Sequence, residues 1–146
     1  AVSTLEAMAY NVTAYDCVVC AAMDARCNQV YVALFRVNGG KVERLTEEEC
    51  LKTDEAARML SEYDDDIMLV GDGAFIMKKA TDNEGLENVK IAPDPLRYQT
   101  GYGVCLAAVN APRLTPAQLM PMYLKLPQAQ RELMAKNAEA YKERKE

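Results

Sequence analysis

The sequence contains no histidine among its 146 residues. Histidine is the commonest general base and the commonest metal ligand in proteins, because its pKa lies near neutral pH. Its absence excludes a Cys–His nucleophilic pair and every histidine-based metal centre. No serine stands in the setting of a nucleophile elbow either. The sequence therefore gives no support to peptidase chemistry.

Long apolar runs are also missing. No segment approaches the roughly 20 apolar residues that a membrane-spanning helix needs, and no secretory leader is recognisable. The five cysteines form an odd set at irregular spacing, which predicts reduced thiols in a cytoplasmic protein. The length fits one domain, 1–146. Because the chain begins with alanine rather than methionine, we expect it to be part of a longer protein.

Charge is unevenly distributed along the chain. The formal net charge is −5, and residues 43–94 hold 15 acidic and 6 basic side chains. Residues 125–146 are mildly basic, with 6 bases and 4 acids. Nucleic acids are bound by clustered lysine and arginine. An acidic chain with one mildly basic end predicts that any contact with RNA is indirect.

Hydrophobic periodicity predicts strands alternating with helices. The expected strands are 17–23, 29–37, 41–46, 67–70 and 89–91, and the expected helices are 4–10, 53–63, 74–79, 94–110 and 128–145. The order β-β-β-α-β-α-β-α predicts an α/β fold. It is the order of a ribonuclease H-like lobe, the unit found in the actin-like ATPase superfamily. We expect a five-stranded mixed sheet with helices on both faces, its second strand antiparallel to its neighbours.

Cys17 and Cys20 form a C-x-x-C pair. A redox pair of this type needs its first thiol at a helix N-terminus. Here both residues lie within an apolar strand, where side chains three apart point to opposite faces. We interpret them as small core residues. A structural zinc site would need a second pair, which the sequence lacks.

The turn after the first strand contains Asp24 and Arg26. A phosphate-binding turn at this point needs glycine, so that backbone N–H groups can approach the anion. The residue between them is Ala25, which argues against phosphate binding. Arg26 could still hold a carboxylate or phosphate. The other interpretation is an Asp24–Arg26 pair that fixes a tight turn.

Gly71-Asp72-Gly73 joins the fourth expected strand to a helix. A helix N-terminus in this position can bind an anion, but a single G-x-G is a weak phosphate signature. Asp72 would also repel phosphate. The structural interpretation is a tight turn in which Asp72 caps the helix.

Two apolar segments are candidate interfaces. Leu5 and Met8 lie on the short first helix, and Met120, Met122, Tyr123 and Leu124 lie in a proline-interrupted stretch. Methionine suits adaptable contacts. We expect one of these segments to contact another lobe, another subunit or a second copy of the chain, unless both pack onto their own domain.

Four sequence blocks resemble the YeaZ/TsaB family, which is also described as glycoprotease-like or M22 peptidase-like. They are V-S-T-L-E-A-M-A at 2–9, M-D-A-R with V-Y-V-A at 23–26 and 30–33, L-V-G-D-G-A at 69–74, and P-M-Y-L-K at 121–125. Lys125 stands where the family usually has arginine. The opening strand and the rest of the family's N-terminal lobe are absent, so the resemblance covers a C-terminal lobe.

The resemblance implies a non-catalytic scaffold subunit of the bacterial assembly that adds threonylcarbamoyl to tRNA adenosine. Its partners would be a TsaD-like catalytic subunit and a TsaE-like ATPase, with tRNA contacted only indirectly and a homodimer as a further association. It implies no catalytic residue, no metal and no cofactor. The family pairs mainly through first-lobe helices, so we expect this lobe alone not to support tRNA modification.

Two alternatives stay open. One is a nucleotide-binding or hydrolase lobe with its own activity, which could be ATPase- or kinase-like, nuclease-like or glycoprotease-like. Two-metal nuclease chemistry needs converging carboxylates, and the first strand offers none before Asp24. The other is a tRNA-binding module that uses the basic C-terminal helix, for which a local charge of +2 is weak support.

Overall fold

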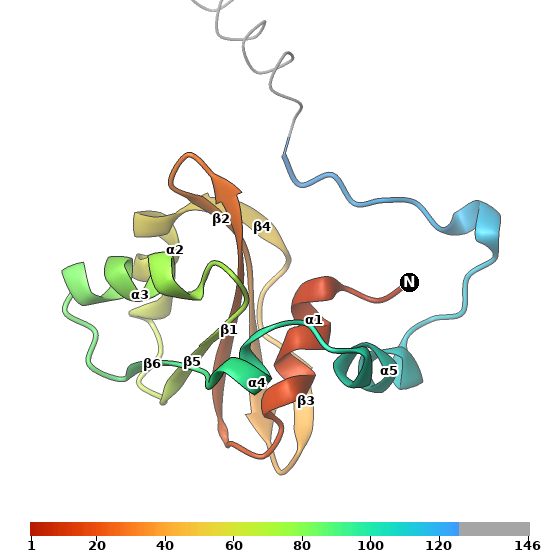
Figure 1. Cartoon of the computed structure of the whole chain (residues 1–146), viewed down its shortest axis with the longest axis horizontal. Helices are drawn as coiled ribbons and strands as arrows, with labels where there is room; N and C mark the ends of the chain where they lie inside the picture. Colours follow the sequence, from red (N-terminus) through yellow and green to blue (C-terminus); the bar gives the residue numbers. More distant parts are fainter. Residues whose placement is uncertain (126–146) are drawn as a thin grey trace, which may run out of the picture.

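A six-stranded mixed sheet forms the centre of the structure, a computed structural model that describes residues 1–125 (Figure 1). The order across the sheet is β3-β2-β1-β5-β6, with β4 also paired to β2. β2 is antiparallel to β1, β3 and β4, whereas β1, β5 and β6 are parallel. The predicted mixed sheet and the antiparallel second strand are therefore confirmed. The strands are β1 Cys17–Arg26, β2 Gln29–Asn38, β3 Lys41–Arg44, β4 Glu49–Lys52, β5 Ile67–Val70 and β6 Val89–Ile91.

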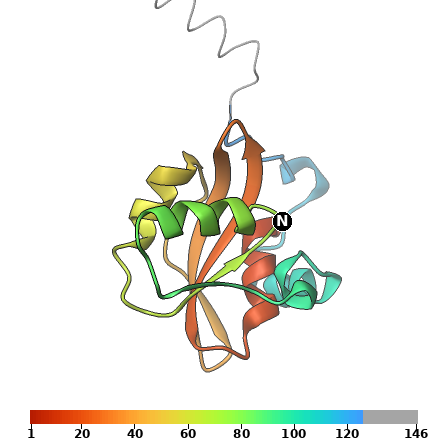
Figure 2. The same ribbon diagram turned by 60° about the vertical axis from the view of Figure 1, so that its left-hand side comes forward.

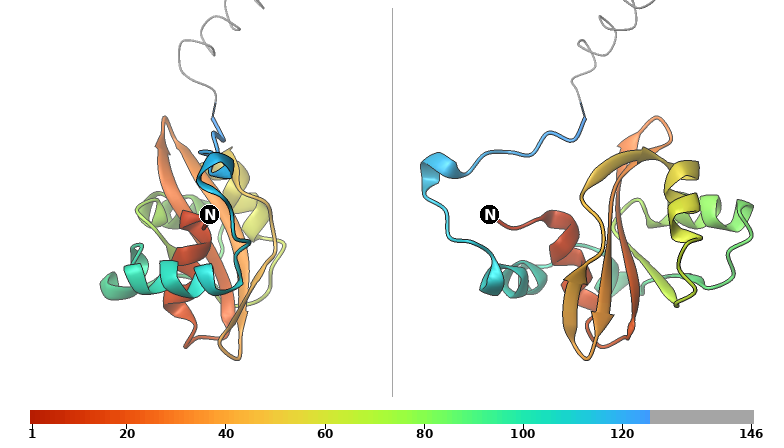
Figure 3. Two further views of the ribbon diagram at one scale, coloured as in Figure 1. Left: turned by 90° about the vertical axis from the view of Figure 1, so that its right-hand side faces the viewer. Right: turned by 180° about the vertical axis from the view of Figure 1, so that it is seen from behind.

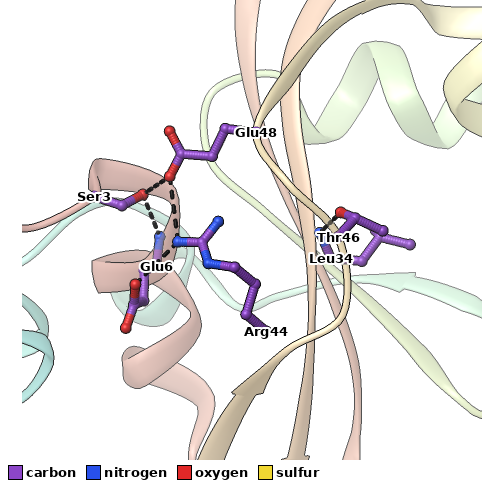
Figure 4. Close-up of polar contacts among 6 residues, drawn as sticks. All are labelled: Ser3, Glu6, Leu34, Arg44, Thr46 and Glu48. Atoms are coloured by element: carbon purple, nitrogen blue, oxygen red, sulfur yellow. Dashed lines mark hydrogen bonds and ion pairs between the residues drawn. The ribbon is translucent and has the colours of Figure 1, made fainter. Parts of the chain in front are cut away.

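β4 is the strand that the sequence did not predict, and it makes six strands of the expected five. β3 pairs with residues 35–38 of β2, and β4 pairs with residues 29–32. Between them, the Thr46 hydroxyl accepts a hydrogen bond of 2.9 Å from the Leu34 amide (Figure 4). The Leu34 carbonyl accepts from the Leu45 amide at 2.9 Å. One long strand thus has two short partners along the same side.

Helices cover both faces of the sheet, as predicted. On one face lie α2 (Thr53–Leu60) and α3 (Ala74–Asn83); on the other lie α1 (Thr4–Ala9) and the 3₁₀ turn η1 (Tyr10–Val12) (Figure 2). Alternate residues of β1 supply the two cores: Val18, Cys20 and Ala22 pack toward α2 and α3, whereas Cys17, Val19 and Ala21 pack toward α1. Strands buried on both faces read as continuous apolar runs, as this one does.

The predicted helix over 94–110 is wrong, because it is two helices. α4 (Asp94–Arg97) ends at Tyr98, which is extended, and α5 (Gly101–Asn110) begins after Thr100. The Thr100 hydroxyl accepts from the Gly103 amide at 3.0 Å and caps α5. Asn11 fixes the break, since its side-chain amide donates to the Tyr98 carbonyl at 2.7 Å. The chain continues through the 3₁₀ turn η2 (Pro116–Gln118), and the expected helix 128–145 lies outside the described residues.

The hairpin between β1 and β2 uses an uncommon backbone. Arg26, Cys27 and Asn28 have φ angles of 64°, 55° and 57°. Pairing of Arg26 with Gln29 leaves Cys27 and Asn28 as a two-residue turn with positive φ at both positions, the type I′ geometry. Residues other than glycine and asparagine are unfavourable there. This turn therefore carries backbone strain at Cys27.

Replacement of Cys27 by glycine should relieve that strain. We expect Cys27→Gly to raise the free energy of unfolding by about 0.5–1 kcal/mol in urea titrations. Cys27→Val is the matched control, since it also removes this exposed thiol but places a β-branched residue at positive φ. It should lower the same quantity by about 1 kcal/mol or more. Equal effects of the two variants would contradict a type I′ turn.

Candidate functional site

The carboxyl ends of β1, β5 and β6 meet at one edge of the sheet. In open α/β sheets this edge is where ligands bind. Five residues singled out in the sequence lie here, in the last residues of β1 and the turn that follows β5: Asp24, Arg26, Gly71, Asp72 and Gly73. The structure therefore brings the two predicted turns together.

Asp24 and Arg26 form a local pair. The Arg26 amide donates to Asp24 Oδ1 at 2.7 Å, and the guanidinium lies 3.3 Å from Asp24 Oδ2. The Arg26 side chain is 86 % exposed. The pairing of β1 with β2 is irregular between Asp24 and Arg26, just before the hairpin turn. An exposed ion pair adds little stability, so the main effect of this pair is to fix the backbone at that irregularity. The arrangement matches the interpretation of Asp24–Arg26 as a turn-fixing pair.

Asp72 does not cap α3, contrary to the sequence-based interpretation. Gly73 occupies the N-cap position, and no side chain accepts a hydrogen bond there. Instead, Asp72 Oδ1 accepts from the Asp24 amide at 3.0 Å. The carboxylate therefore joins the turn after β5 to the end of β1. The sequence could not show this contact because the two residues are 48 positions apart.

Gly71 and Gly73 are needed for close packing against β1. The Gly73 amide donates to the Ala22 carbonyl at 3.0 Å, and the Gly71 amide donates to the Arg97 carbonyl at 2.7 Å. A Cβ at Gly71 would lie 2.0 Å from the Ala22 oxygen, and the φ angle of Gly71 is +96°. The amides of both glycines are thus bonded to the protein itself.

Arg97 belongs to the same edge and was not found from the sequence. It is 6 % exposed, and its guanidinium lies 4.6 Å from the ring centre of Phe75 and 4.8 Å from that of Tyr98. Its Nη2 lies 2.7 Å from Asp94 Oδ1. Hydrogen bonding to the Tyr98 hydroxyl, with a contribution from the Asp94 carboxylate, raises the pKa of Arg97. Nε is buried without a partner among the described residues.

The candidate interface residues divide into two groups. Leu5 and Met8 are 3 % and 2 % exposed and pack into the core beneath α1. The expectation that they form a surface is therefore wrong, because the helix turns its apolar face toward the sheet. Met120, Met122 and Tyr123 are 77 %, 70 % and 83 % exposed, and Leu124 is half-buried.

The segment 119–125 forms one wall of a groove of about 800 Å³. The opposite wall includes Ser3, Met23 and Tyr31. At its end, Lys125 Nζ donates to the Ala25 carbonyl at 2.8 Å. Segment 119–125, which we call the methionine segment, therefore returns to the hairpin beside Asp24 and Arg26. The candidate interface thus adjoins the candidate binding turn.

A polar cluster borders this groove (Figure 4). Ser3 caps α1 by accepting from the Glu6 amide at 3.1 Å, and its hydroxyl donates to Glu48. Arg44 bridges Glu6 at 3.0 Å and Glu48 at 3.3 Å. The one guanidinium is thus shared by two carboxylates, and the cluster is better suited to holding α1 against the sheet than to binding an anion.

The cysteines behave as the sequence indicated. Cys17 and Cys20 pack on opposite faces of the sheet. Burial raises the pKa of Cys20 to about 12, and burial with help from Asp66 and Asp16 raises that of Cys17. Neither thiol is activated as a nucleophile. Within residues 1–125, no group of three or more Cys, Asp or Glu side chains is arranged to hold a metal ion. No helix in this part of the chain is long and apolar enough to cross a membrane.

The fold is shared with a solved structure. The crystal structure of an uncharacterized protein with similarity to peptidase YEAZ from Pseudomonas aeruginosa superimposes with a TM-score of 0.61 at 18 % sequence identity. The match covers 85 % of this chain and 57 % of that one, so the chain spans little more than half of its structural relative. No family model matches the sequence, and no curated protein matches it. The likeness establishes a YeaZ-like, ribonuclease H-like fold.

Proposed function

We propose that this chain is a binding lobe without catalytic activity of its own. Its role would be that of the C-terminal lobe of a TsaB-type scaffold subunit. In that role it supports a TsaD-like catalytic subunit, with a TsaE-like ATPase, in the modification of tRNA adenosine. The observation that supports the proposal is the turn after β5, at the carboxyl edge of the sheet. Its Gly71 and Gly73 amides are hydrogen-bonded to the chain itself.

That turn is closed by the protein's own atoms. A nucleotide-binding lobe of this fold class needs free backbone amides and space for phosphate at this edge. Here the Gly71 and Gly73 amides donate to carbonyl groups of the chain, and Asp72 accepts from the Asp24 amide. A phosphate would also meet the carboxylates of Asp24 and Asp72. The edge therefore favours a structural role over phosphate chemistry.

The exposed methionine segment supports a role in protein contact. Met120, Met122 and Tyr123 are mostly exposed and lie beside the hairpin, to which Lys125 is bonded. Exposed apolar residues gathered in one place typically mark interaction sites. Flexible methionine side chains adapt to a partner surface. We assign this segment to the contact with the catalytic subunit.

Calorimetry with Mg-ATP tests the absence of nucleotide chemistry. We expect no binding tighter than about 1 mM, which corresponds to about −4 kcal/mol. Arg26 and Arg113 are both exposed. The variants Arg26→Ala and Arg113→Ala should show the same absence of ATP binding as the parent chain. Micromolar binding that Arg26→Ala abolishes and Arg113→Ala preserves would support the nucleotide-binding alternative and overturn the proposal.

Co-expression with a TsaD-like subunit tests the partner role. Because the family pairs mainly through first-lobe helices, we expect a tagged chain to bind the catalytic subunit weakly, and a single affinity step should retain part of it. Met120→Glu with Met122→Glu should weaken that retention, because each places a charge in an apolar contact. Thr115→Glu, at an exposed position shortly before segment 119–125, is the control. If the methionine variants retain as much catalytic subunit as the parent chain, this segment is not the contact. If the parent chain retains none, the partner role is ruled out.

A further inference from the structure

The groove beside the methionine segment has apolar side chains on both of its walls. Met23 and Tyr31 face each other across β1 and β2 and are half-buried. Met120, Met122 and Tyr123, on the other wall, are at least 70 % exposed. The methionine segment follows α5 in the chain, passes near the N-terminus and returns toward the β1–β2 hairpin (Figure 3). The described part of the chain thus leaves both walls only partly covered.

One end of this groove is acidic. Glu47 and Glu48 line it, and Glu47 is exposed. Arg44 lies 3.0 Å from Glu6 and 3.3 Å from Glu48. Three carboxylates and one guanidinium therefore give this end a local charge of −2. An apolar, methionine-lined groove with an acidic end is suited to a helix that carries bases beside an apolar stripe.

The sequence beyond the described residues has this pattern. The chain continues for 21 residues after Lys125, and we call residues 126–146 the tail. A helix is expected over 128–145. At about 3.6 residues per turn, Met134, Ala138 and Tyr141 fall on one stripe.

The charges of the expected helix are divided between its two sides. Four of its five bases lie within about a quarter-turn of the apolar stripe: Arg131, Lys142, Arg144 and Lys145. Its three acids lie on the opposite side: Glu132, Glu139 and Glu143. The apolar side of the tail is therefore also its basic side.

We propose that the tail folds back as a basic amphipathic helix into the groove of the same molecule and covers the methionine segment. The tail begins at the groove, because Lys125 Nζ donates to the Ala25 carbonyl at 2.8 Å. Pro127 suits the first turn of a helix. A short tether gives the tail a high effective concentration at the groove, which favours it over a separate molecule.

This inference does not depend on the proposed function. It rests on the match between the groove and the tail, in which bases meet the acidic end and the apolar stripe meets the exposed methionines. A protein that uses the methionine segment as its contact must first displace the tail. The tail would therefore regulate access to this surface.

Oxidation of the methionines tests whether the tail covers the groove. Hydrogen peroxide transfers one oxygen atom to the methionine sulfur and leaves as water, which gives the sulfoxide. In the full chain we expect Met120 and Met122 to react slowly, as followed by peptide mass spectrometry. Met134→Glu with Tyr141→Glu should raise both rates at least about fivefold, because covered side chains react only while the tail is out of the groove.

Ala129→Glu with Ala140→Glu is the matched control. It adds the same charge on the side of the expected helix opposite the stripe, and should leave both rates unchanged. Met59, half-buried against the core, should keep its rate in every variant, which shows that the domain stays folded. If Met120 and Met122 react as fast in the parent chain as in the stripe variant, the proposal is wrong. Protection that is lost on dilution would assign the tail to the groove of a second copy and would also overturn it.

Glu47→Lys tests the charge match without changing the tail. A lysine at the acidic end repels the bases of the tail, so the oxidation rate of Met120 should rise at least about twofold. Glu87→Lys, at an exposed position outside the groove, makes the same charge change and should have no effect. Equal rates in the two variants would overturn the proposed contact between the tail and the acidic end.

Discussion

Gly71→Ala should lower the free energy of unfolding by about 3–5 kcal/mol, a large share of the stability of a domain of this size. The added Cβ would lie 2.0 Å from the Ala22 oxygen and 3.3 Å from the Met8 side chain. The first of these contacts is with the backbone of β1, which is paired on both sides within the sheet. The clash therefore cannot be relieved by a rotamer change. Urea unfolding followed by circular dichroism measures the loss.

Gly85→Ala is the matched control for this prediction. Gly85 also has a positive φ, +77°, but a Cβ there would meet no atom within 4 Å. Its replacement should cost only the backbone strain, about 1 kcal/mol. The difference between the losses in the free energy of unfolding of the two variants measures the cost of the clash between the turn and β1. Equal losses would show that the glycine at 71 serves the turn conformation alone.

Gly103→Ala should lower the free energy of unfolding by about 2–3 kcal/mol through overpacking. A Cβ there would lie 2.2 Å from the Ala7 oxygen and 2.7 Å from Asn11 Oδ1. We expect α5 to shift away from α1 and to lose the hydrogen bond between Thr100 and Asn11. Hydrogen exchange of the α5 amides should accelerate more than that of β1. This pattern would distinguish local detachment from general destabilisation.

Gly101→Ala provides the comparison for α5. A Cβ at Gly101 would meet no atom within 4 Å, and alanine favours the helix over glycine. The variant should be as stable as the parent or slightly more stable, with unchanged exchange in α5. A loss as large as that of Gly103→Ala would refute the close crossing of α5 over α1.

Much of the fold followed from local patterns in the sequence. The apolar run 17–23 produced the expected strand β1, and β5 and β6 have the predicted bounds. β4 was missed because its four residues, Glu49 to Lys52, carry little strand propensity and depend on pairing with β2. The break before α5 had a readable signal, since Thr100 is a good N-cap residue. The expected helix 94–110 ran through that position.

The candidate site was less predictable than the fold. The sequence placed Asp24 and Asp72 in separate turns, and only the parallel pairing of β1 with β5 brings them together. The burial of Leu5 and Met8 depends on which way α1 faces, which periodicity leaves open for so short a helix. Arg97 could not be found at all, because its environment comes from the aromatic ring of Phe75 in α3.

The pairing of β2 with two short strands in place of one long strand affects how the protein behaves in concentrated solution. An exposed sheet edge can template strand addition by another molecule, and long flat edges are the most hazardous. Here the outer edge consists of β3 and β4, each of four residues. The Thr46 hydroxyl occupies the Leu34 amide where neither strand pairs with β2. An incoming strand would find no continuous ladder to extend, which protects this edge against amyloid-like growth.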